Sequence, residues 1–181
     1  FHKWKFDASW FINVGGDFVL NAKTQFGFLG LYNRKLGLTQ FERFRLGGDG
    51  LAGFDFLQGS EVVGLRGYAN NSVVPDGTND TQTGNPIYSK YVLELRHPIT
   101  LSDQASVFGL VFAEGGNTWN RFTEFSPFNV KRSVGVGVRI FLPIFGLLGL
   151  DYGYGFDRIP GNPDANKGQF HFSISQSLGG F

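Results

Sequence analysis

The sequence predicts an all-β chain that forms part of a transmembrane outer-membrane β-barrel. Apolar and polar residues alternate with a period of two in several segments, as in a strand with one apolar and one polar face. The polar faces are rich in glycine and serine, which suits a crowded or hydrated lumen better than an open protein surface. Short and long connections also alternate, as they do when short turns face the periplasm and long loops face outside.

A soluble β-sandwich would alternate as well, with its apolar face turned inward. Aromatic residues make up 17% of the chain and collect at strand ends, like the interfacial girdles of outer-membrane barrels. The most apolar run, IFLPIFGLLGL at 140–150, is too short for a spanning helix and contains Pro143 and Gly146. The sequence therefore excludes a helical membrane protein and favours a barrel over a sandwich.

Composition limits the possible functions. The formal net charge of +1 gives no basic footprint, so we expect no nucleic-acid partner. The chain has no cysteine, and its three histidines lack metal-ligand spacing, so we expect no metal site. It also has no nucleophile elbow, paired-carboxylate motif or phosphate loop, so we expect neither enzyme activity nor a cofactor.

Seven strands are predicted from the alternation, at about residues 2 to 13, 17 to 30, 88 to 98, 105 to 116, 131 to 142, 147 to 156 and 168 to 178. The first two alternate aromatic and aliphatic residues with charged or polar ones across the tight turn VGGD. The third and fourth flank the turn TLSDQ. The fifth and sixth set valine, leucine and tyrosine against glycine around the turn PIFG. The seventh sets phenylalanine and isoleucine against histidine and serine.

The longest connection runs from about 31 to 87. The strands on either side run in opposite directions, so it is one external loop or contains an even number of extra strands. We favour the single loop, in which QFERFRLGG at 40–48 is an ordered limb rather than a barrel strand. Seven strands leave two open edges, whereas single-chain bacterial barrels have an even number from eight upward. We therefore expect part of a larger barrel, in a mature or truncated product that begins at Phe1 without a leader.

Four motifs carry a resemblance to a known family. GLRGY at 64–68 lies in the long loop, and FAEGGNTW at 112–119, FLPIFGLLGLDYGYG at 141–155 and a short alternating strand follow it. In this order and spacing they resemble the C-terminal barrel of the Omp85 superfamily, and FERFRLGGDGLAGF before the arginine is similar to its Bacteroidetes branch. The resemblance implies a 16-stranded barrel with residues 1–181 as its C-terminal part. The long connection is then external loop six, and the other strands and the POTRA domains lie outside this chain.

Without the resemblance, Arg66 would be interpreted as a solvated loop arginine. In the family, the tip of loop six folds back into the lumen, where its arginine packs on acidic and aromatic residues. The residues that the resemblance assigns to the tip are Leu65, Arg66, Gly67 and Tyr68, and those assigned to a Phe-x-Asp-x-Gly motif are Phe112, Glu114 and Gly116. In this motif, Glu114 stands where the family has aspartate. A dehydrated guanidinium needs a carboxylate partner. Glu114 is the first candidate partner of Arg66, and Asp151 is the second. Three other charges, Glu94, Arg96 and Arg139, are expected to be general lumen-lining groups.

The last strand is where the resemblance implies a lateral gate. Family members usually end on an aromatic residue that continues the outward face of this strand. The residues that continue this face here are Phe170, Phe172, Ile174, Gln176 and Leu178, so Leu178 stands in the place of that aromatic. Phe181 follows Gly179 and Gly180 one step out of register. Either these glycines form a bulge that restores the register, or the terminus is a short extension.

For function, the resemblance implies the central insertase of outer-membrane β-barrel assembly in a Gram-negative bacterium. Clients would be folded and inserted at a weak seam between the first and last strands. The implied partners are outer-membrane lipids and lipopolysaccharide, nascent β-barrel proteins and accessory assembly subunits. The alternative within the superfamily is a polypeptide exporter, of the two-partner secretion or TamA-like kind, with the same arginine-tipped loop. A passive porin is disfavoured because its lumen does not need this combination of arginine and acid.

Overall fold

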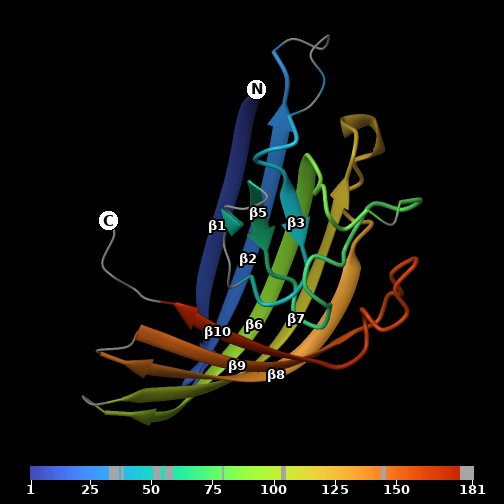
Figure 1. Cartoon of the computed structure of the whole chain (residues 1–181). Helices are drawn as coiled ribbons and strands as arrows, with labels where there is room; N and C mark the ends of the chain where they lie inside the picture. Colours follow the sequence, from blue (N-terminus) through green and yellow to red (C-terminus); the bar gives the residue numbers. More distant parts are fainter. Residues whose placement is uncertain are drawn as a thin grey trace.

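The computed structural model describes residues 1–32, 37, 39–50, 54–55, 59–78, 80–102, 105–143 and 146–175. Within these ranges, seven strands form one antiparallel sheet in the order β1-β2-β6-β7-β8-β9-β10, which curls from β1 to β10 in Figure 1. The strand bounds are β1 His2–Gly15, β2 Phe18–Gly30, β6 Ile87–Leu101, β7 Ser106–Trp119, β8 Lys131–Leu142, β9 Gly146–Gly155 and β10 Gln169–Ser175. No helix in the described ranges is long and apolar enough to cross a membrane.

The seven predicted strands are confirmed, and three of them are longer than expected. β1 continues to Gly15. β7 continues to Trp119, and β6 continues past Pro98 to Leu101. Proline has no N–H to give to the ladder, and the sheet accommodates it through a register shift between Pro98 and Thr100. The part of the predicted last strand beyond Ser175 lies outside the described residues.

The two faces of the sheet have the opposite polarity to that of a soluble protein. Residues that pair directly across neighbouring strands share a face. Large apolar side chains on the outward face are exposed, among them Trp4, Phe6, Trp10, Val111, Val136, Leu150 and Phe170. Polar side chains on the inner face are buried, among them Asn21, Glu94, Glu114, Asp151 and His171. This arrangement fits lipid on the outward face and a polar lumen on the inner face.

The loop between β2 and β6 contains a small sheet of its own. Its strands are β3 Phe44–Leu46, β4 Phe54–Asp55 and β5 Ser60–Val63, in the order β3-β5-β4 with β3 parallel to β5. β2 pairs directly with β6, so the described part of the loop adds no strand to the large sheet. The limb at residues 40–48 therefore contributes β3 to the small sheet.

An apolar core joins this loop to the inner face of the large sheet. Phe44, Leu46 and Leu65 are fully buried, and the Phe44 ring centroid lies 4.7 Å from that of Tyr88 in β6. Gly116 of β7 leaves room for the two leucines, because a Cβ atom there would lie 3.2 Å from Leu46 and 3.3 Å from Leu65. Each such buried side chain stabilises the fold by about 1.5–3 kcal/mol. The core keeps the segment after β5 inside the lumen.

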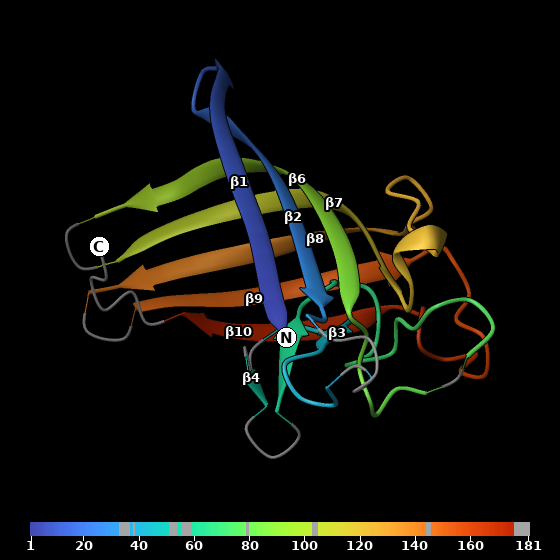
Figure 2. The same ribbon diagram turned by 90° about the horizontal axis from the view of Figure 1, so that it is seen from above.

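A set of ion pairs ties the same loop to β1. Figure 2 shows the start of β1 next to the small sheet, and there Glu61 of β5 contacts Lys3 at 2.9 Å and Lys5 at 2.7 Å. Lys3 also lies 2.9 Å from Glu42. Burial raises the pKa of Glu61, but hydrogen bonds and charges from the two lysines outweigh this and hold the pKa below its usual value. The carboxylate therefore stays ionised and the loop stays attached to β1.

Candidate functional site

The loop tip, residues 65–68, lies close to the backbone of β8 and β9. Gly67 has a φ of +87°, which disfavours any residue with a side chain. A Cβ atom on it would lie 2.9 Å from the Ser133 Cβ and 3.0 Å from the Gly155 nitrogen. On the facing strand, a Cβ atom on Gly153 would lie 2.6 Å from the Gly67 nitrogen. Glycines on both sides therefore allow the two backbones to approach each other.

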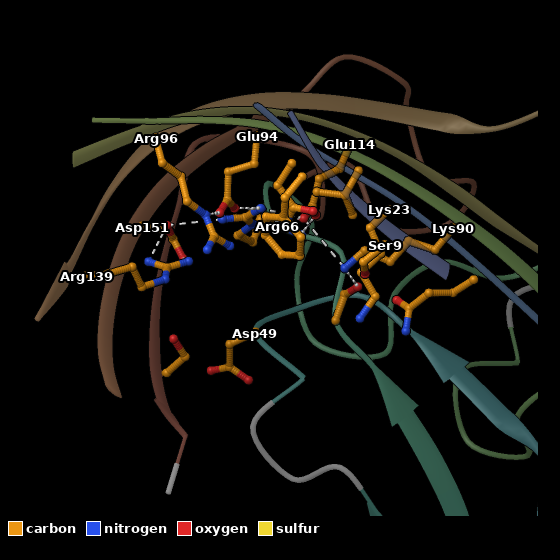
Figure 3. A pocket seen from close by; sticks show the side chains of 16 residues that line it. Ser9, Lys23, Asp49, Arg66, Lys90, Glu94, Arg96, Glu114, Arg139 and Asp151 are labelled. Carbon is orange, nitrogen blue, oxygen red and sulfur yellow. Dashed lines mark hydrogen bonds and ion pairs between the residues drawn. The ribbon is translucent and has the colours of Figure 1, made fainter. Parts of the chain in front are cut away.

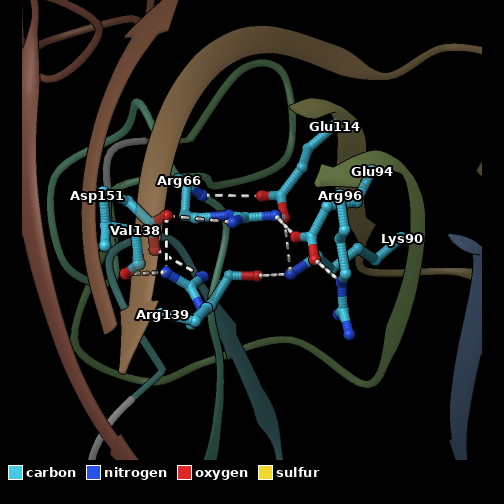
Figure 4. Close-up of polar contacts among 9 residues, drawn as sticks. Arg66, Lys90, Glu94, Arg96, Glu114, Val138, Arg139 and Asp151 are labelled. Carbon is cyan, nitrogen blue, oxygen red and sulfur yellow. Dashed lines mark hydrogen bonds and ion pairs between the residues drawn. The ribbon is translucent and has the colours of Figure 1, made fainter. Parts of the chain in front are cut away.

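The guanidinium of Arg66 meets three carboxylates that come from three strands (Figure 4). Its Nε donates to Glu114 Oε1 in β7 at 2.9 Å, and its main-chain N–H donates to Glu114 Oε2 at 2.8 Å. Nη2 donates to Glu94 Oε2 in β6 at 2.9 Å, and Nη1 to Asp151 Oδ1 in β9 at 3.3 Å. The Phe112 ring centroid lies 3.6 Å from Arg66 Cζ. The planar, five-donor guanidinium suits this set of simultaneous contacts.

Three more cations extend these contacts into one network. The added contacts are Arg139 with Asp151 through two bonds of 2.8 Å, Arg96 Nε with Glu94 at 2.5 Å, and Lys90 Nζ with Glu114 at 3.5 Å. Lys90 also donates to the Gly64 carbonyl at 2.6 Å, next to the tip. Four cations thus share three carboxylates whose side chains are at most 5% exposed. Buried charges of this kind are tolerated only when they are paired.

The network keeps Arg66 charged. Burial lowers the pKa of its guanidinium, but the charges of Glu114, Asp151 and Glu94 outweigh burial and raise the pKa above its ordinary value. A polar cavity of about 380 Å³ lies beside the network, and Figure 3 shows Arg66 and its carboxylates with Lys23 and Asp49 around it. Within the described ranges, no group of three or more His, Asp or Glu side chains is placed to hold a metal ion. The arrangement can hold the loop by ionic contacts.

The tip also contacts the last strand through His171 of β10. The N–H of Gly67 donates to His171 Nε2 at 2.8 Å, and His171 is 6% exposed. His171 pairs with Asp151 across β9 and β10, so it lies on the inner face next to the arginine network. The spacing of the histidines gives no indication of this role. The signal that could have found it is the position of His171 on the polar face of the last predicted strand.

Tyr68 fixes the outer side of the tip at the ends of β8 and β9. Its hydroxyl donates to the Arg132 carbonyl at 2.7 Å and accepts from the Asp157 N–H at 3.2 Å. Burial raises the pKa of Tyr68 to about 12, so the hydroxyl stays protonated and able to donate. The Ala69 N–H donates to the Ala165 carbonyl at 2.8 Å, which attaches the tip to the connection between β9 and β10 as well.

Substitution Tyr68→Phe is expected to lower the free energy of unfolding by about 1–2 kcal/mol, because the Asp157 N–H loses the hydroxyl as its acceptor and the Arg132 carbonyl keeps only the Phe156 N–H as a donor. Urea unfolding of the full-length barrel in lipid vesicles measures this change. The matched control is Tyr32→Phe, at a residue that is 82% exposed, for which we expect a change within about 0.5 kcal/mol. Equal effects of the two substitutions would contradict a structural role for the Tyr68 hydroxyl.

Comparison with known proteins decides the family of this chain. Residues 1–178 match the Omp85 superfamily domain. The chain belongs to the Omp85 superfamily. Among solved structures, the Omp85 chain is similar to BamA from Haemophilus ducreyi lacking POTRA domains 1-3, with a TM-score of 0.64 and 19% sequence identity. The match covers 94% of this chain and 34% of the BamA chain, so the present chain spans about a third of that structure. No curated protein matches the sequence.

These comparisons confirm the predicted fold class, an all-β portion of an outer-membrane barrel. The total of 16 strands stays a prediction.

The structure brings together the residues that the Omp85 resemblance assigned to the arginine site. Both candidate partners, Glu114 and Asp151, contact Arg66, and Glu114 does so through main chain and side chain. The expectation that Glu94, Arg96 and Arg139 are general lumen charges was wrong, because Glu94 binds Arg66 directly and the two arginines bind its carboxylate partners. Alternation along a strand identifies a face but gives no pairing between distant strands, so it could not separate these residues from other polar ones.

The predicted gate residues of the last Omp85 strand are only partly described. Phe170, Phe172 and Ile174 point outward and are 79%, 47% and 47% exposed. The remaining four, Leu178, Gly179, Gly180 and Phe181, lie outside the described residues.

Proposed function

We propose that this chain is the C-terminal part of an insertase barrel that folds client β-barrel proteins into the outer membrane of a Gram-negative bacterium. The observation that carries the proposal is the loop-six tip, whose arginine is held on the inner face by Glu94, Glu114 and Asp151. A buried guanidinium is costly unless carboxylates meet it, and the three that do so here come from three different strands. Here it fixes a loop whose next residue, Gly67, touches the last strand.

The proposed mechanism is strand addition at a seam that borders β10. A client strand adds to an exposed edge through main-chain hydrogen bonds, which give affinity, while its alternating side chains set the register. In the described sheet β10 is an edge strand whose one neighbour is β9, so its other edge is where a client strand would add. Loop six then acts as a structural support inside the barrel rather than as a catalyst.

The proposal also defines the partners. The outward aromatic and aliphatic side chains would contact outer-membrane lipids and lipopolysaccharide. Nascent β-barrel proteins would be the clients, and accessory outer-membrane or periplasmic subunits would assist. The mechanism requires no enzyme activity, cofactor or nucleic acid.

Depletion of the full-length protein in its host tests the proposal. We expect β-barrel proteins in general to be lost from the outer membrane, as measured by quantitative proteomics of membrane fractions, because a general insertase serves many clients. Re-expression of the wild-type gene is the control and should restore them. Loss of one secreted polypeptide with barrels unchanged would favour the exporter instead, and no change in either would contradict both functions.

A further inference from the structure

The contact between the loop tip and β10 depends on an unprotonated ring nitrogen. His171 Nε2 accepts the Gly67 N–H at 2.8 Å, so the imidazole is neutral and carries its proton on Nδ1. In the protonated ring both nitrogens are donors, and Nε2 cannot accept. Protonation would therefore set two N–H groups against each other and leave the buried Gly67 N–H without this acceptor.

The charged groups around the imidazole come from every element packed against it. They are Asp49 and Arg66 of the loop, Glu114 of β7 and Asp151 of β9. The three carboxylates can accept a hydrogen bond from an imidazolium, whereas Arg66 opposes its positive charge. Three nearby negative charges therefore favour the protonated ring, while the Gly67 N–H loses its acceptor.

The arginine contacts respond differently to the same change. Arg66 is bound by ionised carboxylates that keep their charge across the pH range in which histidine titrates, roughly 7.5 to 5.5. The Ala69 N–H, bound to the Ala165 carbonyl, has no titrating group. The attachment of Arg66 to β6, β7 and β9 and the attachment of Gly67 to β10 are therefore chemically separable.

We propose that His171 couples the loop-six tip to the last strand, and that protonation of its imidazole releases β10 from the tip while Arg66 stays bound. His171 is a positioning residue, since it acts on β10 through Gly67. The regulatory meaning rests on the proposed function, because freeing β10 affects insertion only if β10 borders the seam. The coupling itself does not depend on that function.

Two substitutions separate the hydrogen bond from its protonation. His171→Gln keeps an acceptor, the Oε1 oxygen, at similar reach but cannot titrate. His171→Leu fills the space without an acceptor. The measurement is amide hydrogen exchange of Gly67, resolved to single residues by mass spectrometry, on the full-length protein in lipid nanodiscs. The Arg66 amide, which donates to Glu114, is the internal reference because it corrects for the intrinsic effect of pH on exchange.

At about pH 7.5 we expect wild type and His171→Gln to protect Gly67 equally, and His171→Leu to exchange about tenfold faster, as for loss of one hydrogen bond. At about pH 5.5 we expect wild type to approach the leucine variant while His171→Gln stays protected. Unchanged Gly67 exchange in His171→Leu would overturn the coupling. Wild type and His171→Gln that remain equal at both pH values would overturn the release by protonation.

Two controls make the result decisive. If His171→Leu fails to fold, judged by heat-modifiable migration on gels, the comparison of wild type with His171→Gln still tests the pH response. Exchange at Gly67 is independent of client insertion. The depletion experiment can therefore fail while the coupling holds, and the coupling can fail while depletion still removes outer-membrane barrels.

Discussion

Substitution Arg66→Met is expected to lower the free energy of unfolding of the full-length barrel by about 3–5 kcal/mol, because it leaves buried carboxylates without their shared cation. Glu114 suffers most, since its Oε1 loses both Nε at 2.9 Å and Nη2 at 2.7 Å, while the main-chain N–H of residue 66 remains bound to Oε2. Urea titration in lipid vesicles, followed by tryptophan fluorescence, measures the change. The matched control is Arg121→Met, whose side chain is 79% exposed, for which we expect a change within about 0.5 kcal/mol.

A double-mutant cycle with Glu114→Gln measures the interaction energy between Arg66 and Glu114, apart from the effects of the two single substitutions. Once Arg66 is gone, the buried Glu114 carboxylate keeps only the more distant Lys90 at 3.5 Å as a cationic partner. Neutralising it then costs less than in the parent, so the double variant should be more stable than the two single effects predict. We expect a coupling energy of about 0.5–3 kcal/mol. Simple additivity, or an Arg66→Met effect no larger than that of Arg121→Met, would contradict the role of the arginine network in holding the loop.

Substitution Gly153→Ala is expected to displace the loop tip. The added Cβ would lie 2.6 Å from the Gly67 nitrogen and 2.9 Å from its Cα, and backbone atoms cannot rotate away as a side chain can. Such overpacking costs about 1–3 kcal/mol. The reporter is a Ser72→Cys substitution in the cysteine-free sequence, because Ser72 is only 2% exposed while the loop is docked. We expect faster maleimide labelling of this cysteine when the tip is displaced.

The control for this prediction is Gly109→Ala in β7. A Cβ atom there would meet Ile99 Cδ1 at 3.5 Å, which is ordinary van der Waals contact, so labelling and stability should stay close to those of the parent. If Gly153→Ala labels no faster than Gly109→Ala, the close approach of tip and strand does not occur in the folded protein.

The strands of this fold could be predicted from the sequence because their signal is local. Alternation over ten or more residues places Trp4 and Phe170 outward and Glu114 and Asp151 inward, and the structure has them there. Partners across the sheet are not local. The bulge between Pro98 and Thr100 shifts the β6–β7 register by one residue. Counting residue pairs outward from the β6–β7 turn would therefore assign Glu94 the wrong partner in β7. The family motif identified Arg66, but the motif names neither Glu94 nor His171.

The separations along the chain in the arginine network have a consequence for the order of folding. Arg66 meets Glu94, Glu114 and Asp151, which follow it by 28, 48 and 85 residues, and Gly67 meets His171 104 residues later. Contacts between residues so far apart in sequence form after local hairpins. The chain loses the conformational entropy of closing the loop before the contact contributes any stabilising energy. The β6–β7 hairpin alone supplies two carboxylates, whereas the third carboxylate and the imidazole arrive with the last two strands. We therefore expect full docking of the loop to be a late folding event. It occurs only once β9 and β10 have joined the large sheet.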